Sequence, residues 1–208
     1  MAELQEKQDW DRLKHLPDRI KLPLAFAAVP LLAEAKRLDA GAWTDHFVPQ
    51  HYRGEWSVVP LRAPGGANHP ILRITSPPGC NDWQETEYLT LCPEIAKVLT
   101  LLRAPLGAVR LMRLGPESSI LRHSDHDLSA DYGQVRLHVP LTTNPQVDFR
   151  VNDSTVTMLP GECWYLRLSD PHSVDNRGPT ERIHLVIDAM VNDWLAELLV
   201  RAAGDGTF

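Results

Sequence analysis

The stretch that decides the fold is QVRLHVPLTTNPQVDFRVNDSTVTMLPGECWYLRL, residues 134–168. Short runs rich in β-branched and aromatic residues are separated here by Pro, Asn, Asp and Gly, which favour turns. Such runs at close spacing predict β-strands packed as a sandwich or a small barrel. A jelly roll buries one face of each of its two sheets, so we expect a mainly β fold of this kind.

The segments on both sides of this stretch extend the pattern. Further strands are predicted within the ranges 55–66, 107–118, 172–178 and 182–190. Helices are predicted at 30–41, at 93–103 and after Asn192, each from apolar residues at helical spacing. We therefore expect a single domain, with a helical lead-in over 1–50, a jelly-roll core over 52–190, and a C-terminal helix and tail over 191–208.

Composition narrows the kinds of partner. The chain has 208 residues, of which 43% are hydrophobic, and this is enough for one buried core. A net charge of −6 without a block of Lys or Arg argues against nucleic acid. The longest apolar stretch, 22–35, contains prolines and is too short to span a bilayer, so we expect no membrane partner and a cytoplasmic location. Three widely spaced cysteines predict small core residues instead of disulfides or a zinc site.

The segment RHSDHD, residues 122–127, is the most unusual feature of the chain because it contains two His and two Asp and no apolar residue. A surface turn is one interpretation. The other is a metal site, since a continuing strand would direct His123 and Asp125 to the same face. His172, in SDPHSVDN, is the best third ligand because it stands where a new strand is predicted. Two imidazoles and one carboxylate leave coordination positions open, as in non-haem Fe(II) oxygenases.

Arg182 is the second unusual feature. It opens the otherwise apolar predicted strand RIHLVID, ten residues after His172. Burying a guanidinium without a partner costs free energy, so we expect an anion beside it.

The ordered set of H-x-D at 123–125, His172 and Arg182 resembles the aspartyl/asparaginyl β-hydroxylase family of 2-oxoglutarate- and Fe(II)-dependent oxygenases. The segments LGPESSILRH, RLHVPL, GECWYL, HSVDNRG and RIHLVID are similar to strands of that family, over roughly residues 105–190. Bacterial free-amino-acid hydroxylases, notably the cis-proline hydroxylases, look most alike. The resemblance implies a double-stranded β-helix, a cupin-like jelly roll, with flanking α-helices.

The resemblance also implies cofactors and roles. His123, Asp125 and His172 would bind Fe(II), and Arg182 would bind the distal carboxylate of 2-oxoglutarate. The pair Arg136 and His138 matches an Arg-x-His pair of the family, which assigns Arg136 to a substrate carboxylate and His138 to 2-oxoglutarate. With O2 as co-substrate, the implied reaction hydroxylates an unactivated C–H of an amino acid, free or in a peptide, and releases succinate and CO2.

Two other classes of function stay open. A cupin-like isomerase or hydrolase would use the same metal ligands without 2-oxoglutarate, and would give Arg182 no anionic co-substrate. A non-catalytic jelly-roll module would leave RHSDHD as a polar turn. His126 and Asp127 have no counterpart in the family, and His184 is equally compatible with the core and with a role behind the site.

Overall fold

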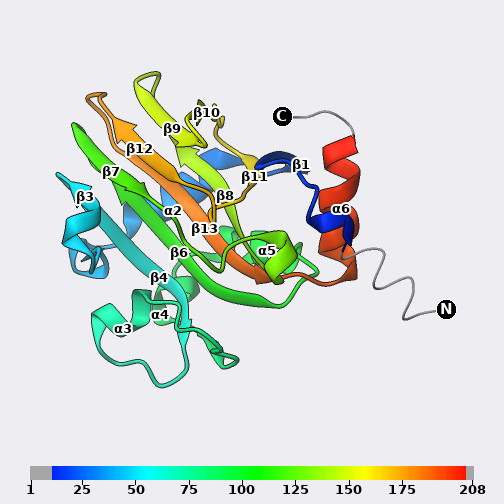
Figure 1. Cartoon of the computed structure of the whole chain (residues 1–208). Helices are drawn as coiled ribbons and strands as arrows, with labels where there is room; N and C mark the ends of the chain where they lie inside the picture. Colours follow the sequence, from blue (N-terminus) through cyan, green and yellow to red (C-terminus); the bar gives the residue numbers. More distant parts are fainter. Residues whose placement is uncertain (1–10, 205–208) are drawn as a thin grey trace.

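The computed structural model describes residues 11–204 and consists of two antiparallel β-sheets packed face to face, with helices on the outside (Figure 1). The larger sheet has eight strands, in the order β1 (Arg19–Ala25), β11 (Glu162–Leu166), β8 (Gln134–Thr142), β13 (Arg182–Met190), β6 (Leu106–Leu114), β4 (Trp56–Pro64) and β2 (Thr44–Asp45), with β5 (Trp83–Glu85) paired to β4. The smaller sheet has five, in the order β10 (Ser154–Thr155), β9 (Val147–Val151), β12 (His172–Asn176), β7 (Ser118–His123) and β3 (Tyr52–Arg53). This confirms the predicted jelly roll with flanking helices.

Alternation along the strands of the larger sheet separates two cores. In β13, Ile183, Leu185 and Ile187 belong to a cluster shared with the helices, whereas Val186 belongs to a second cluster between the sheets. Successive side chains of a strand point to opposite faces, so the even-numbered residues of β13 face the smaller sheet. The side chains at these positions therefore help to line the space between the two sheets.

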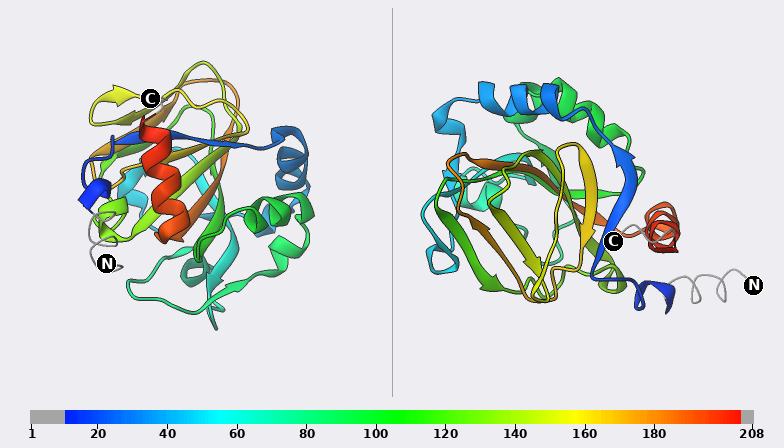
Figure 2. Two further views of the ribbon diagram at one scale, coloured as in Figure 1. Left: turned by 90° about the vertical axis from the view of Figure 1, so that its right-hand side faces the viewer. Right: turned by 90° about the horizontal axis from the view of Figure 1, so that it is seen from above.

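The helices are α2 (Ala28–Arg37), α3 (Pro70–Ile74), α4 (Glu87–Thr90), α5 (Pro93–Thr100) and α6 (Asp193–Gly204), with short 3-10 turns η1 (Ala40–Ala42), η2 (Pro49–His51) and η3 (Ala130–Tyr132). The buried residues of α2, α4, α5 and α6 pack on the outer face of the larger sheet, whereas Ile74 of α3 belongs to the cluster between the sheets. Figure 2 shows α2 and α5 lying together against the outside of the barrel. None of the helices between residues 11 and 204 has the length and hydropathy of a transmembrane segment.

The predicted helices are confirmed. In α5 the side chains of Ile95, Val98 and Leu99 are buried in the outer core, as their spacing predicts. The carboxylate of Glu34, on α2, accepts hydrogen bonds from the first backbone N–H groups of α5 and joins the two helices. At the other end of the chain, the side chain of Asn192 accepts the backbone N–H of Leu195, as expected of an N-cap.

The helical lead-in predicted over 1–50 is wrong for its middle part. Residues 19–25 form β1, which pairs with β11 along the edge of the larger sheet, and residues 1–10 lie outside the described part of the chain. The segment RIKLPLA contains a proline and does alternate, with Ile20 and Leu22 buried. Proline is tolerated in a strand at a sheet edge, and the charged residues around it hid the alternation.

Candidate active site

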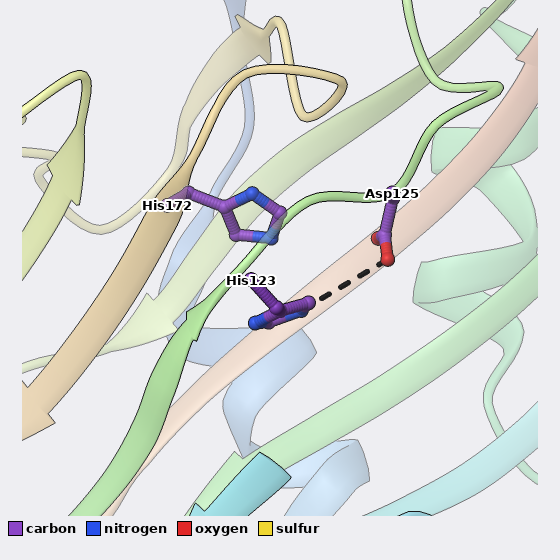
Figure 3. A group of neighbouring side chains, drawn as sticks. All are labelled: His123, Asp125 and His172. Atoms are coloured by element: carbon purple, nitrogen blue, oxygen red, sulfur yellow. Dashed lines mark ion pairs between the residues drawn. The ribbon is translucent and has the colours of Figure 1, made fainter.

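Three potential metal ligands meet at one end of the space between the sheets. His123 is the last residue of β7 and His172 the first of β12, and the two are cross-strand partners in the smaller sheet. Asp125 follows two residues after β7. One ligand atom from each residue lies within 4.8 Å of the others, and Figure 3 shows the three side chains directed toward one another.

Backbone hydrogen bonds fix the orientation of both imidazole rings. Nδ1 of His123 lies 2.7 Å from the carbonyl oxygen of Leu121, and Nδ1 of His172 lies 3.0 Å from that of Asp170. A carbonyl only accepts, so each Nδ1 carries the proton and each Nε2 presents a lone pair. Burial lowers the pKa of the His172 imidazole from 6.5 to about 4, which keeps that ring neutral and able to bind a metal.

Asp125 reaches the site by a different route from the one predicted. The strand ends at His123, so the pleat of β7 does not carry Asp125. Instead, its backbone N–H donates to the carbonyl of Leu168 at 2.8 Å. This bond holds the turn that contains Asp125 against the segment that follows β11. Its Oδ1 lies 3.9 Å from Nε2 of His123, and its Oδ2 accepts a hydrogen bond from Arg136. One oxygen is thus held by the protein and the other faces the histidines.

A cavity of about 430 Å³ opens beside these three residues, between the two sheets. Polar side chains of the larger sheet form its floor, and the segments 46–51 and 74–78 lie at its edge. Its apolar wall includes Trp56 and Phe149. A concave, mostly apolar space with a few convergent polar groups is typical of a small-molecule site.

One end of the floor holds a cation that has no acidic partner. Arg182 is 2% exposed, and no carboxylate of residues 11–204 lies within ion-pair distance of it. Its Nη2 donates to Nδ1 of His184 at 2.7 Å, its guanidinium lies 5.4 Å from the centre of the Phe149 ring, and its Nε–H has no hydrogen-bond partner. Burial lowers the pKa of Arg182 from 12.5 to about 9. This end of the cavity is suited to an external anion.

His138 lies next to this arginine. Its Nδ1 is 3.4 Å from Nδ1 of His184, and its Nε2 is buried, borders the cavity and has no hydrogen-bond partner. Burial, together with the positive charge of Arg182, lowers the pKa of His138 well below 6.5. The ring is therefore neutral.

The other end of the floor carries charges that are matched within the protein. Asp188 of β13 lies directly across from Arg136 of β8 and accepts two hydrogen bonds from it, at 2.6 and 3.0 Å. Arg110 of β6 donates to the same carboxylate at 3.1 Å. Burial raises the pKa of Asp188, but the two arginines outweigh it and lower the pKa to about 2. Since Arg136 also binds Asp125, a chain of ion pairs runs from the buried Asp188 to the candidate metal ligands.

Comparisons with known proteins agree with this geometry. The family model described as aspartyl/asparaginyl beta-hydroxylase matches residues 31–191. The chain belongs to this family. An L-proline cis-4-hydroxylase from Rhizobium meliloti (strain 1021) is 37% identical over 79 residues, a match that covers 38% of this chain and 28% of the relative.

Two solved structures share the fold of this hydroxylase-family chain. A 2OG-Fe(II) oxygenase family oxidoreductase from Burkholderia pseudomallei superposes with a TM-score of 0.56 at 16% identity, covering 89% of this chain and 91% of the other. A prolyl-4-hydroxylase from Pseudomonas putida gives a TM-score of 0.51 at 17% identity, covering 89% and 98%. At these identities the likeness concerns the jelly-roll fold.

The structure brings all six predicted site residues of this family member to one cavity. His123, Asp125 and His172 form the ligand cluster. The other three, Arg136, His138 and Arg182, line the cavity floor. The anion expected beside Arg182 is absent from the described part of the chain, whereas Arg136 has two carboxylate partners.

Sequence reasoning missed Arg110 and Asp188. Both stand in predicted strands, GAVRLMRL and RIHLVID, at positions that alternate with apolar residues, and a charged residue in such a strand was the available signal. Their pairing joins strands 78 residues apart along the chain, which the sequence does not reveal. His46, stacked on Trp56 with ring centres 3.5 Å apart at the cavity edge, was also missed.

The structure also locates the residues whose roles the sequence left open. His126 and Asp127 are exposed and lie at the edge of the cavity. Trp164 is buried between the sheets and does not line the cavity, so it is a core residue. The side-chain amide of Asn176 donates hydrogen bonds to the carbonyl oxygens of Gly115 and Thr180 and stabilises a turn. All three cysteines are free; Cys92 and Cys163 are core residues, as predicted, whereas Cys80 is only partly buried and lies outside the core.

Proposed function

We propose that this protein is a 2-oxoglutarate- and Fe(II)-dependent dioxygenase that hydroxylates an unactivated C–H of an amino acid. One observation carries the proposal: an open-sided cluster of two histidines and one carboxylate shares a single cavity with a buried arginine that has no acidic partner. A metal isomerase or hydrolase would need the cluster but gives no reason to keep Arg182 unpaired. The family membership supports the same activity.

The residues present fit Fe(II). Both imidazoles offer Nε2 lone pairs held by backbone hydrogen bonds, and Asp125 offers Oδ1. This is the donor set of non-haem iron oxygenases, which leaves several coordination positions for exogenous ligands. When bound, iron would supply the activation of O2 that is coupled to conversion of 2-oxoglutarate to succinate and CO2.

The residues also fit 2-oxoglutarate. The co-substrate carries two carboxylates, and we assign the distal one to Arg182, whose unpaired Nε–H and planar guanidinium suit a carboxylate. His138, whose unpaired Nε2 faces the same cavity, is assigned to the co-substrate as well. The neutral state of His138 leaves the positive charge of Arg182 as the attraction for the anion.

The substrate is assigned to the opposite end of the floor. Arg136 was predicted as the anchor of its carboxylate, and two arginines share Asp188 there. Arg110 is 2% exposed, borders the cavity, and has an Nε–H without a partner, so we include it with Arg136 in the anchor. A metal bound through Oδ1 of Asp125 would share the charge of that carboxylate, so Asp188 would be the main match for the two guanidinium groups, which favours an anionic substrate group. The name of the curated relative makes L-proline the first free amino acid to test.

A turnover assay tests the proposal. Purified protein is supplied with Fe(II), ascorbate and 2-oxoglutarate, and succinate release is measured against L-proline, other cyclic and acidic amino acids, short peptides and carboxamide-blocked versions of each. We expect release that requires iron and 2-oxoglutarate together with a substrate bearing a free carboxylate. The His172→Ala variant is the control and should lose both iron and turnover.

The outcomes separate the alternatives. Metal-dependent conversion of a substrate without consumption of 2-oxoglutarate would instead support a cupin-like isomerase or hydrolase. A folded protein that takes up no iron would support a binding module. Equal turnover of carboxamide-blocked substrates would remove the carboxylate anchor from the proposal.

A further inference from the structure

His184 is the residue behind Arg182. It lies two positions further along β13, on the same face of the larger sheet, and is 2% exposed. Its Nδ1 is 2.7 Å from Nη2 of Arg182. A guanidinium can only donate, so His184 accepts through Nδ1 and holds its own proton on Nε2. The ring is the only hydrogen-bond partner of the Arg182 side chain among residues 11–204.

The choice of a neutral acceptor matters for a ligand-binding arginine. At the other end of the same floor, the carboxylate of Asp188 accepts from Arg110 and Arg136 and takes up their charge. An aspartate or glutamate at position 184 could accept the same hydrogen bond from Arg182, but it would form an internal ion pair that a ligand must then compete with. An apolar residue would leave a buried N–H donor without a partner and the guanidinium without a fixed orientation.

We propose that His184 is a positioning residue for the co-substrate, which holds the guanidinium of Arg182 in the cavity without neutralising it. This inference rests on the proposed function, because it takes 2-oxoglutarate to be the anion that binds the unpaired guanidinium of Arg182. The same ring also lies 3.4 Å from Nδ1 of His138, the other residue assigned to the co-substrate. His184 therefore contacts both of these cavity-lining side chains, although it is not itself among the residues that line the cavity.

Three substitutions at this position separate hydrogen bonding from charge. His184→Gln keeps a neutral acceptor, His184→Leu removes the acceptor at similar volume, and His184→Asp supplies an acceptor with negative charge. The measurement is binding of 2-oxoglutarate to the Fe(II)-loaded protein under anaerobic conditions by titration calorimetry. Pyruvate, a 2-oxo acid without the distal carboxylate, is the matched control ligand because it cannot reach Arg182 while it binds the metal.

The proposal predicts an order of affinities for 2-oxoglutarate. We expect His184→Gln to bind within about threefold of the parent, His184→Leu about tenfold more weakly, and His184→Asp at least about thirtyfold more weakly, following the strength of a charge-assisted hydrogen bond. Pyruvate affinity should stay the same in all four proteins, since a role in the metal ligands or the general fold would change both ligands together.

Two results would overturn the proposal: equal 2-oxoglutarate affinity in the Gln, Leu and Asp variants, or parallel loss of pyruvate and 2-oxoglutarate. If His184→Asp does not fold, the difference between Gln and Leu decides. Failure of the parent to bind 2-oxoglutarate in a metal-dependent way would overturn the proposed function together with this inference. Normal binding by the parent with no effect of substitution would overturn the inference alone.

Discussion

Arg136 and Arg182 lie on the same face of the larger sheet, both largely buried and both bordering one cavity, yet the protein treats their charges differently. Arg136 binds the carboxylates of Asp188 and Asp125, whereas the one hydrogen-bond partner of the Arg182 side chain within residues 11–204 is a neutral imidazole. A buried charge is costly unless it is paired. The difference teaches that carboxylates of the protein fix the position of Arg136, whereas the charge of Arg182 is left for the ligand that we propose it binds.

The two ends also differ in how they relate to the metal ligands. Arg136 connects Asp188 to the oxygen of Asp125 that faces away from the histidines. Partners of this kind orient a ligand, and they matter for metal affinity nearly as much as the ligands do. Arg182 makes no contact with the ligand cluster. Substitutions at the two ends should therefore change different properties of the protein.

The largest effect is expected from Asp188→Asn, which leaves Arg110 and Arg136 without their shared carboxylate. Breaking a buried ion pair by removing one partner typically lowers the free energy of unfolding by about 3–5 kcal/mol. Urea denaturation of the variant and the parent measures this loss in the free energy of unfolding. The matched control is Asp175→Asn, which breaks an exposed pair with Arg177 and should cost less than about 1 kcal/mol. Similar losses in the two variants would mean that the charges at this end are not structural.

Arg182→Leu should separate binding from stability at the other end. We expect 2-oxoglutarate affinity to fall by about 2–3 kcal/mol, because a charge-assisted pair to the ligand is lost. The free energy of unfolding should stay the same or rise, since an uncompensated buried charge is removed. Calorimetry and urea denaturation measure the two quantities. A marked loss of stability with unchanged 2-oxoglutarate affinity would reverse the comparison.

Arg136→Gln tests whether this arginine serves the metal as well as the substrate. If it orients Asp125, Fe(II) affinity should fall by about 10- to 100-fold, or about 1.4–2.7 kcal/mol. An arginine that only bound the substrate would leave Fe(II) affinity intact and change kcat/KM alone. Iron titration of the purified variant, with Asp125→Ala as the reference for a lost ligand, distinguishes the two roles.

The prediction with the smallest effect near neutral pH concerns titration, because the two ends should lose stability in different ranges of pH. Burial lowers the pKa of His184 well below 6.5, so its contribution to stability is complete above pH 6.5 and is lost as the pH falls. Asp188, with its pKa lowered from 3.8 to about 2, loses its contribution only below pH 3.8. As the pH falls below 6.5, His184→Gln should therefore lose stability less steeply than the parent, by up to about 1.4 kcal/mol per pH unit.

The Asp188→Asn variant supplies the contrast for this experiment. Its stability difference from the parent should be constant between pH 6.5 and 4.5 and should shrink below pH 3.8, as the Asp188 of the parent becomes protonated. Unfolding free energies measured at half-unit steps of pH would show this. Parallel curves for the parent and His184→Gln above pH 4 would mean that His184 is not held neutral by burial.

Much of the fold could be predicted because it depends on local patterns. Alternation and turn residues located β6 and the strands from β8 to β13, helical spacing located α2, α5 and α6, and β7 was expected from the family resemblance. The strand β1 was missed because an edge strand carries charged residues and proline, which weaken the pattern. Asp125 was placed near the histidines for a reason that the structure corrects, since a bond to Leu168 holds it in place of the strand pleat.

The sequence by itself indicated the class of fold through its strand pattern, and it indicated the residue types of the candidate site because H-x-D, a later histidine and an arginine in an apolar strand resemble the ordered set of a known family. Only the tertiary structure decided which charges are matched. Asp188 and Arg136 face each other across two strands, 52 residues apart in the chain, while Arg182 donates its hydrogen bond to His184 and has no carboxylate partner in the described part of the chain. Free energies of buried charges depend on neighbours within a few ångströms, and sequence order does not give those distances.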